Sequence, residues 1–138
     1  MKRAGFIFGG MNDHEKIDDP ITYRIIGCAM KVHSFLGNGF PEVIYQRSLD
    51  IELAKSGLNF ERESEQNVYY DNKVVGKRIV DFVIEKKILL ELKATSEINE
   101  HHFAQIINYL KAYNIEIGLL INFGAKSLQF KRFINTNL

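Results

Sequence analysis

The sequence predicts an α/β sandwich in which a central mixed sheet is flanked by helices. Apolar residues recur at helical spacing in the first part of the chain, and the spacing then changes to the alternation of strands. One further helical segment separates these strands from the last two. A helical crossover leaves two strands parallel, whereas strands joined by short turns are antiparallel, so the sheet should be mixed.

Length and composition agree with one globular domain. The chain has 138 residues, of which 46% are hydrophobic and 25% are charged, and such values exclude a disordered or collagen-like chain. Residues 1–18 contain Gly9-Gly10 and Asn12-Asp13 but no sustained period. We therefore expect a flexible N-terminal arm over residues 1–18 and a single domain over residues 19–138.

Cysteine usage and hydropathy predict the compartment. Cys28 is the one cysteine of the chain, so it cannot form an internal disulfide or build a zinc site alone. No apolar run approaches the roughly 18 residues that span a bilayer, and no segment resembles a secretory signal. We expect a soluble cytoplasmic protein with no membrane association.

Two helices open the domain. Asp19 followed by Pro20 is typical of a helix cap and first turn, and apolar residues then recur at helical spacing to about Phe35. Pro41 begins a second helix, which should end at Gly57.

Strands follow, and turn residues divide them. The period changes to two after Leu58, which predicts strands over residues 59–63 and 66–70 and a turn at residues 71–72. A further strand should run through residues 74–84.

A helix and two strands complete the order. Ser96 can cap a helix whose apolar residues recur at i, i+4 and i+7 and which should end near Asn114. The apolar run over residues 115–123 predicts a buried strand, and residues 127–134 predict the last strand.

The hairpin of residues 78–84 and 88–94 carries the candidate chemistry. Because strand side chains alternate between faces, each strand has one wholly apolar side, and Asp81, Glu91 and Lys93 lie on the opposite sides among aliphatic residues. Half-buried charges need partners. Mg²⁺ would be such a partner for the carboxylates, and the lysine could orient water or stabilise charge on a phosphate. A structural ion pair between Lys93 and either carboxylate is the alternative interpretation.

The strand register decides between these interpretations. Asp81 and Glu91 share a face if Ile84 pairs with Ile88 around a three-residue loop. A two-residue turn would place the two carboxylates on opposite faces of the sheet and would exclude a common metal ion.

Two motifs resemble a known superfamily. The segments Ile79-Val80-Asp81 and Leu90-Glu91-Leu92-Lys93 resemble the motif of the PD-(D/E)XK nucleases, with Val80 in place of the motif's first proline. The superfamily includes restriction endonucleases, Holliday-junction resolvases and recombination exonucleases. The segment Gly39-Phe40-Pro41-Glu42-Val43-Ile44-Tyr45 is similar to the signature of its GxxExxY family, and the likeness runs from about residue 21 to residue 134.

The resemblance implies a restriction-endonuclease-like sandwich and a catalytic site. Asp81 and Glu91 would bind Mg²⁺, with Mn²⁺ as the expected substitute, and Lys93 would be the catalytic lysine. Glu42 matches the additional acidic residue that many members use at the metal, although a first-turn glutamate is also stabilised by the helix macrodipole. The implied reaction is hydrolysis of a nucleic-acid phosphodiester, with DNA favoured, by metal-activated water and without a covalent intermediate.

Four further residues are candidates for substrate binding. Gln105 and Tyr109 match the Gln-x-x-x-Tyr element of the recombination exonucleases, and their i, i+4 spacing places them on one helix face together with His101. Tyr45 follows one turn after the candidate acidic residue of the second helix. A polar helix surface is the alternative for the first three residues, and simple packing is the alternative for Tyr45.

A second function remains open at this point, because fold alone does not determine function. The chain could be a non-catalytic module that binds nucleic acid or protein on a nuclease scaffold. The joint presence of Asp81, Glu91 and Lys93 favours the enzyme. The net charge of +1 is low for a nucleic-acid binder, although acidic metal ligands cancel part of any basic rim, and it is compatible with a homodimer or a partner protein.

Overall fold

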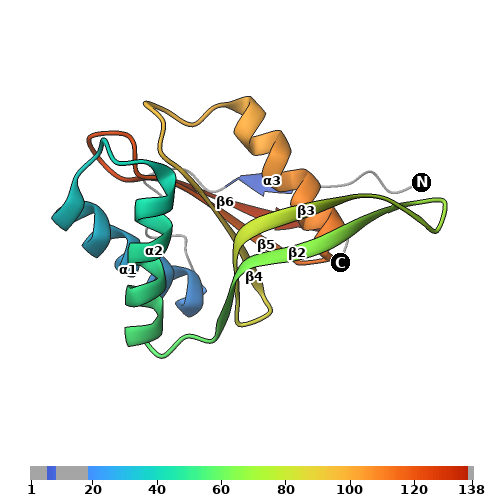
Figure 1. Cartoon of the computed structure of the whole chain (residues 1–138), viewed down its shortest axis with the longest axis horizontal. Coiled ribbons are helices and arrows are strands. Elements are labelled where there is room, and N and C mark those ends of the chain that lie inside the picture. The colour runs from blue at the N-terminus through green and yellow to red at the C-terminus, as the bar shows by residue number, and fades with distance from the viewer. Residues whose placement is uncertain (1–5, 9–18, 137–138) are drawn as a thin grey trace.

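The computed structural model describes residues 6–8 and 19–136 and has the expected α/β architecture, with helices on both faces of one mixed sheet (Figure 1). The six strands have the order β1-β6-β5-β4-β3-β2. Among the strands of the described residues, only β4 and β5 are parallel, and a helix connects them, as the sequence predicts. The elements are β1 (Phe6–Phe8), α1 (Pro20–Leu36), α2 (Glu42–Lys55), β2 (Phe60–Tyr70), β3 (Lys73–Ile84), β4 (Ile88–Lys93), α3 (Glu100–Tyr113), β5 (Ile117–Asn122) and β6 (Gln129–Asn135).

Helices α1 and α2 begin and end close to the predicted residues. The carboxylate of Asp19 accepts hydrogen bonds from the Ile21 amide (3.0 Å) and the Thr22 hydroxyl (2.9 Å), which caps α1 as its sequence indicates. Helix α2 ends just before Gly57, whose φ of 78° suits a residue without a side chain.

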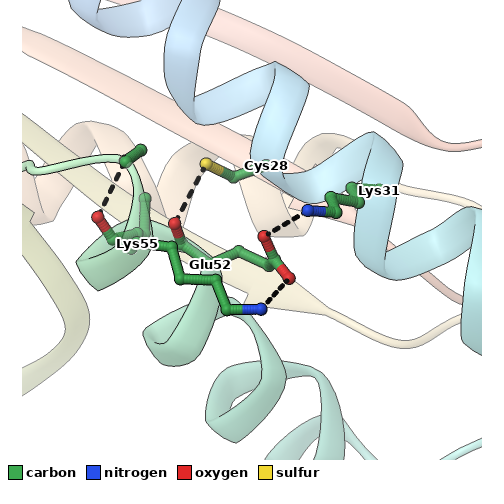
Figure 2. A network of polar contacts seen from close by, with 6 residues as sticks. Cys28, Lys31, Glu52 and Lys55 are labelled. Atoms are coloured by element: carbon green, nitrogen blue, oxygen red, sulfur yellow. Dashed lines mark hydrogen bonds and ion pairs between the residues drawn. The ribbon is translucent and has the colours of Figure 1, made fainter.

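A polar network around Glu52 joins the two helices (Figure 2). Its carboxylate forms ion pairs with Lys31 (3.3 Å) and Lys55 (3.7 Å), and its backbone carbonyl accepts a hydrogen bond from the thiol of Cys28 (3.6 Å). Both lysines are well exposed, so each ion pair contributes about 1 kcal/mol or less. The helices are therefore held mainly by their apolar face against the sheet.

Strand β2 is continuous, so the prediction of two short strands over residues 59–63 and 66–70 was wrong. The backbone of β2 is irregular at Glu63, whose φ is 53°. Glu63 lies opposite Asp81, but these two residues do not form a ladder pair. Strand β3 offers a continuous partner on both sides of this point, which keeps the two halves of β2 in one strand. The turn at Asp71 and Asn72 is confirmed, and both residues have the positive φ of a tight hairpin turn.

Strands β2 and β3 extend beyond the rest of the sheet. Strand β3 pairs with β4 only over Phe82 to Ile84, whereas it pairs with β2 along nearly its whole length. Residues 64–80 therefore form a two-stranded ribbon that projects past α3 (Figure 1). We call these residues the β2–β3 ribbon.

Two apolar cores lie on the two faces of the sheet. One is formed between α1, α2 and the sheet, and the other between α3 and the sheet. Val80 was expected to share a face with Phe82, but it lies in the core under α3 whereas Phe82 lies in the other core. The change of face occurs at Asp81, which lies opposite Glu63 (φ 53°) where the two strands have no ladder pair.

Helix α3 begins later than predicted. Its cap is Asn99 and not Ser96, because the Asn99 side chain accepts hydrogen bonds from the amides of His101 (3.0 Å) and His102 (3.3 Å). The His102 ring in turn accepts from the Asn99 amide, which completes a capping box. The end of the helix at Asn114 is as expected.

Part of the predicted arm is a strand. Phe6–Phe8 forms β1 and pairs with β6, so the expectation that residues 1–18 lack regular structure was wrong for these three residues. Strand β6 would otherwise present a row of unpaired backbone groups at the sheet edge, and β1 satisfies them. The rest of the arm lies outside the described residues. No helix of the described part of the chain is long and apolar enough to cross a membrane.

Candidate functional site

The hairpin of β3 and β4 has the register that a common metal ion requires. Ile84 pairs with Ile88 around a three-residue loop. The first two loop residues have φ values of 52° and 56°, which allow the chain to reverse in this space. In this register Asp81 lies opposite Glu91 across the hairpin, and the register of a two-residue turn is excluded.

The two strands part just beyond this hairpin, and the carboxylates fill the gap. The last ladder pair is Phe82 with Leu90. Beyond it, Asp81 Oδ2 accepts a hydrogen bond from the Leu92 amide (2.7 Å), and Glu91 Oε1 accepts one from the Asp81 amide (3.2 Å). Each carboxylate thus replaces a carbonyl of the missing ladder, which fixes both side chains at the opening of the sheet.

Burial makes it unfavourable for both carboxyl groups of the pair to be ionised. Glu91 is only 6% exposed. Burial, followed by the hydrogen bond and the charge of Asp81, raises the pKa of Glu91 to about 10, while Lys93 partly opposes the shift. Within residues 19–136, neither carboxylate forms an ion pair with a lysine or arginine. Such a pair is stabilised by a shared proton or by a divalent cation.

Helix α2 supplies a buried amide that the sequence did not single out. Gln46 is 7% exposed, and its Nε2 donates to Asp81 Oδ1 (2.8 Å). The Gln46 amide thus bonds one oxygen of the Asp81 carboxylate, and the Leu92 backbone amide bonds the other. Its i, i+4 spacing from Glu42 was a usable signal, because that spacing places both residues on one helix face.

Glu42 lies in the electrostatic field of the same site. It is the first residue of α2, where a carboxylate is favoured by the helix dipole. Burial, and then the charge of Asp81, raise the pKa of Glu42, whereas Lys93 lowers it. The structure therefore places the start of α2 within electrostatic range of Asp81 and Lys93.

Helix α3 anchors the lysine from the other side. Lys93 Nζ donates to Gln105 Oε1 (2.8 Å), and Gln105 Nε2 donates to the Tyr109 hydroxyl (3.1 Å). Burial, and then the charge of Glu91, raise the pKa of Tyr109. The structure thus brings Lys93, Gln105 and Tyr109 into one chain of hydrogen bonds. His101 lies one turn earlier on α3 and is exposed.

Tyr45, in contrast, lies in the core and not at the site. It is fully buried, and its ring stacks on Phe123 with centroids 4.7 Å apart. Its hydroxyl donates to the Gly37 carbonyl (2.6 Å) and accepts from the Phe40 amide (3.3 Å). Tyr45 therefore fastens the loop between α1 and α2, and packing, not substrate binding, accounts for its position.

Asn122 is a second residue that the sequence interpretation missed. It is fully buried on β5 beside Lys93. Its Oδ1 accepts from the Thr95 and Gly124 amides (both 3.0 Å), and its Nδ2 donates to the Thr95 carbonyl and to Gln129 Oε1 (both 2.9 Å). The chain is so close here that a Cβ on Gly124 would lie 2.3 Å from Thr95 backbone atoms. Asn122 therefore fixes the segment that directly follows Lys93.

The oxygen atoms of the site suit a hard divalent cation that takes few ligands from the protein. Within the described residues, no three His, Cys, Asp or Glu side chains converge into a ready metal cage. Mg²⁺ typically takes one or two protein carboxylates and keeps several waters. Asp81 and Glu91 provide that number of carboxylates at one point, with Glu42 in electrostatic range of Asp81.

A groove of about 780 Å³ lies between α3 and the β2–β3 ribbon. Its lining includes Gln105 and Tyr109, the two residues that connect Lys93 to α3. The other residues that line it are Asn67, Val68, Tyr69, Arg78, His101, Ala104, Asn108, Lys111 and Ala112.

Comparisons with known proteins agree with this architecture. The family model of the PD-(D/E)XK nuclease superfamily matches residues 19–133. Among solved structures, the crystal structure of SSO0001 is similar, with a TM-score of 0.55 and 25% sequence identity over 68% of this chain. The match spans 50% of that structure's chain, so this protein corresponds to about half of it. The search of curated proteins gave no significant match.

Proposed function

We propose that this chain, which belongs to the PD-(D/E)XK nuclease superfamily, is a Mg²⁺-dependent nuclease that hydrolyses phosphodiester bonds, with DNA as the favoured substrate. The observation that carries the proposal is the opposition of Asp81 and Glu91 where β3 and β4 part, with Lys93 on the same face of β4. Within the superfamily, residues 39–45 support assignment to the GxxExxY family.

The carboxylates would hold the cation. Asp81 is already oriented by Gln46 and by a backbone amide, and Glu91 by the amide of Asp81. Mg²⁺, with Mn²⁺ as a substitute, would supply Lewis acidity toward the phosphate and ease ionisation of the attacking water. Glu42 would act as a further acidic group at the same place. A cation would also offset the burial and the Asp81 charge that raise the pKa of Glu91.

Lys93 would act on the reacting groups directly. Gln105 fixes its ammonium, and Lys93 follows Glu91 by two residues, on the same face of β4. A fixed positive charge in a partly buried position stabilises the charge that develops on a phosphate, and it can orient water for attack. Water is the nucleophile, so no covalent intermediate with the protein forms.

A cleavage assay on labelled substrates tests the proposal. Single-stranded DNA, duplex DNA and RNA are incubated with the wild-type protein in Mg²⁺, in Mn²⁺ and in EDTA. We expect cleavage in the two metals and none in EDTA. We also expect Asp81→Asn and Lys93→Met each to lower the rate by about 10²-fold or more, as for removal of other preorganised charged groups. Asp71→Asn and Lys87→Met make the same changes at exposed turn residues and should leave the rate unchanged.

Two results would overturn the proposal of nuclease activity. One is cleavage that survives both site variants at the rate of the turn variants. The other is an absence of cleavage on every substrate while the protein still binds nucleic acid, which would indicate the non-catalytic binding module instead.

A further inference from the structure

The groove between α3 and the β2–β3 ribbon differs in charge from the rest of the chain. The whole protein carries 17 acidic residues, almost matching its 18 lysines and arginines. Among the 11 residues that line the groove, none is Asp or Glu, whereas Arg78, Lys111 and His101 are basic or can become so. The groove is therefore a locally electropositive channel in a nearly neutral protein.

The two walls of the groove are fastened to each other. The Tyr113 hydroxyl, on α3, lies within hydrogen-bond distance of the carbonyls of Ser64 (2.5 Å) and Arg78 (3.0 Å), which belong to the two strands of the ribbon and share its one proton. The ribbon thus has a fixed position relative to the helix, although β3 no longer pairs with β4 there. A channel with set walls can bind a ligand without ordering a loop first.

The groove also presents an aromatic ring and amides. Tyr69 lines it and is 59% exposed. The side chains of Asn67 and Asn108 face the same channel from the ribbon and from α3. A basic groove with an exposed aromatic ring is the usual arrangement for single-stranded nucleic acid, because cations follow the phosphates and a ring stacks on an unpaired base.

We propose that this groove holds a single strand of nucleic acid and leads it to the carboxylate site. The inference rests on the proposed nuclease function and adds to it the class of substrate, a single strand or a single-stranded flank. Gln105 and Tyr109 join the two regions, since both line the groove and both belong to the hydrogen-bonded chain of Lys93. A base that stacks on Tyr69 has to be unpaired, which disfavours a continuous duplex.

Fluorescence anisotropy with a labelled oligo-dT of about 15 nucleotides, in the range bound by known single-strand modules, tests the stacking position. Binding is measured in EDTA, so that cleavage does not interfere. We expect Tyr69→Ala to weaken binding roughly 5- to 150-fold, the effect of losing one base–aromatic stack. Tyr70→Ala is the matched control, because Tyr70 is the next residue, is 77% exposed and does not line the groove. It should bind like the wild type.

Salt dependence tests the phosphate contact. Arg78→Gln should lower the slope of log K against log salt by about 0.7, the value for one phosphate contact of a single strand. Lys73→Gln removes the same charge elsewhere on β3 and should leave the slope unchanged. Oligo-U in place of oligo-dT distinguishes RNA from DNA, and a duplex of the same length should bind more weakly than either single strand.

The proposed single-strand groove and the proposed nuclease activity can be refuted independently. Equal affinity of the Tyr69 and Tyr70 variants, or duplex binding as tight as single-strand binding, would refute the groove even if the wild type cleaves DNA in Mg²⁺. Binding that depends on Tyr69 and Arg78 in a protein that never cleaves would refute the nuclease and leave the groove as the binding site.

Discussion

Replacement of Glu91 by glutamine should stabilise the metal-free protein at neutral pH while it abolishes cleavage. The side chain is 6% exposed, and burial together with Asp81 raises the pKa of its carboxyl from 4.5 to about 10. The folded protein then binds a proton at Glu91 that the unfolded chain has released above pH 4.5. The free energy that this proton contributes to folding is fully present below the unfolded pKa and is lost as the pH rises toward the folded pKa.

The size of the effect follows from proton linkage. Between the two pKa values, one proton makes the free energy of unfolding fall by about 1.4 kcal/mol per pH unit. The glutamine side chain of the variant binds no proton, so this contribution to the slope disappears. From pH 5.5 to pH 7.5 the wild type should therefore lose roughly 3 kcal/mol relative to the variant. For a chain of 138 residues this corresponds to roughly 10 °C in Tm.

Urea unfolding of both proteins in EDTA at several pH values measures this difference. Glu97→Gln makes the same change at an exposed position before α3 and should keep the wild-type pH dependence. At pH 7.5, Mg²⁺ should stabilise the wild type and have little effect on Glu91→Gln, because one of the two opposed carboxylates is missing. If the free energy of unfolding in EDTA changes with pH in the same way for the wild type and Glu91→Gln, the raised pKa of this buried carboxyl is refuted.

Two further variants separate positioning from packing. Gln46→Leu removes the amide that donates to Asp81 Oδ1. In the cleavage assay, we expect the Mg²⁺ concentration for half-maximal cleavage to rise about 10- to 100-fold. An unchanged Mg²⁺ dependence would contradict a positioning role for Gln46. Tyr45→Phe removes a hydroxyl that bonds to the α1–α2 loop. Urea unfolding should show that the free energy of unfolding falls by about 1–3 kcal/mol. An unchanged affinity for single-stranded DNA would agree with the position of Tyr45 in the core.

Much of the fold could be predicted because local patterns determine it. The cap at Asp19, the tight turn at Asp71 and Asn72 and the end of α3 at Asn114 depend on residues close in sequence, and each prediction is confirmed. The failures share one physical cause, which is that two local signals compete and contacts elsewhere select one of them. The cap at Asn99 competes with Ser96, and the outcome depends on which one also receives a returning bond from His102.

The candidate site shows the same division. Strand alternation placed Glu91 and Lys93 together, and helical spacing placed Gln105 beside Tyr109, because both rules concern one element at a time. Tyr45 could not be assigned in this way, since its place in the core is decided by Phe123, which is far away in sequence. The i, i+4 spacing places Gln46 on the helix face of Glu42, but its bond to Asp81, 35 residues away in sequence, is decided by tertiary packing.

The sequence by itself determined the order of the elements, their amphipathic faces and the motif residues Asp81, Glu91 and Lys93, because these depend on residue types at short spacing. Only the tertiary structure decided that the hairpin takes the register that opposes the two carboxylates and that the strands part beside them. It also decided that the β2–β3 ribbon faces α3 across a groove. These features depend on how separate elements pack against one another, and side chains distant in the chain fix that packing.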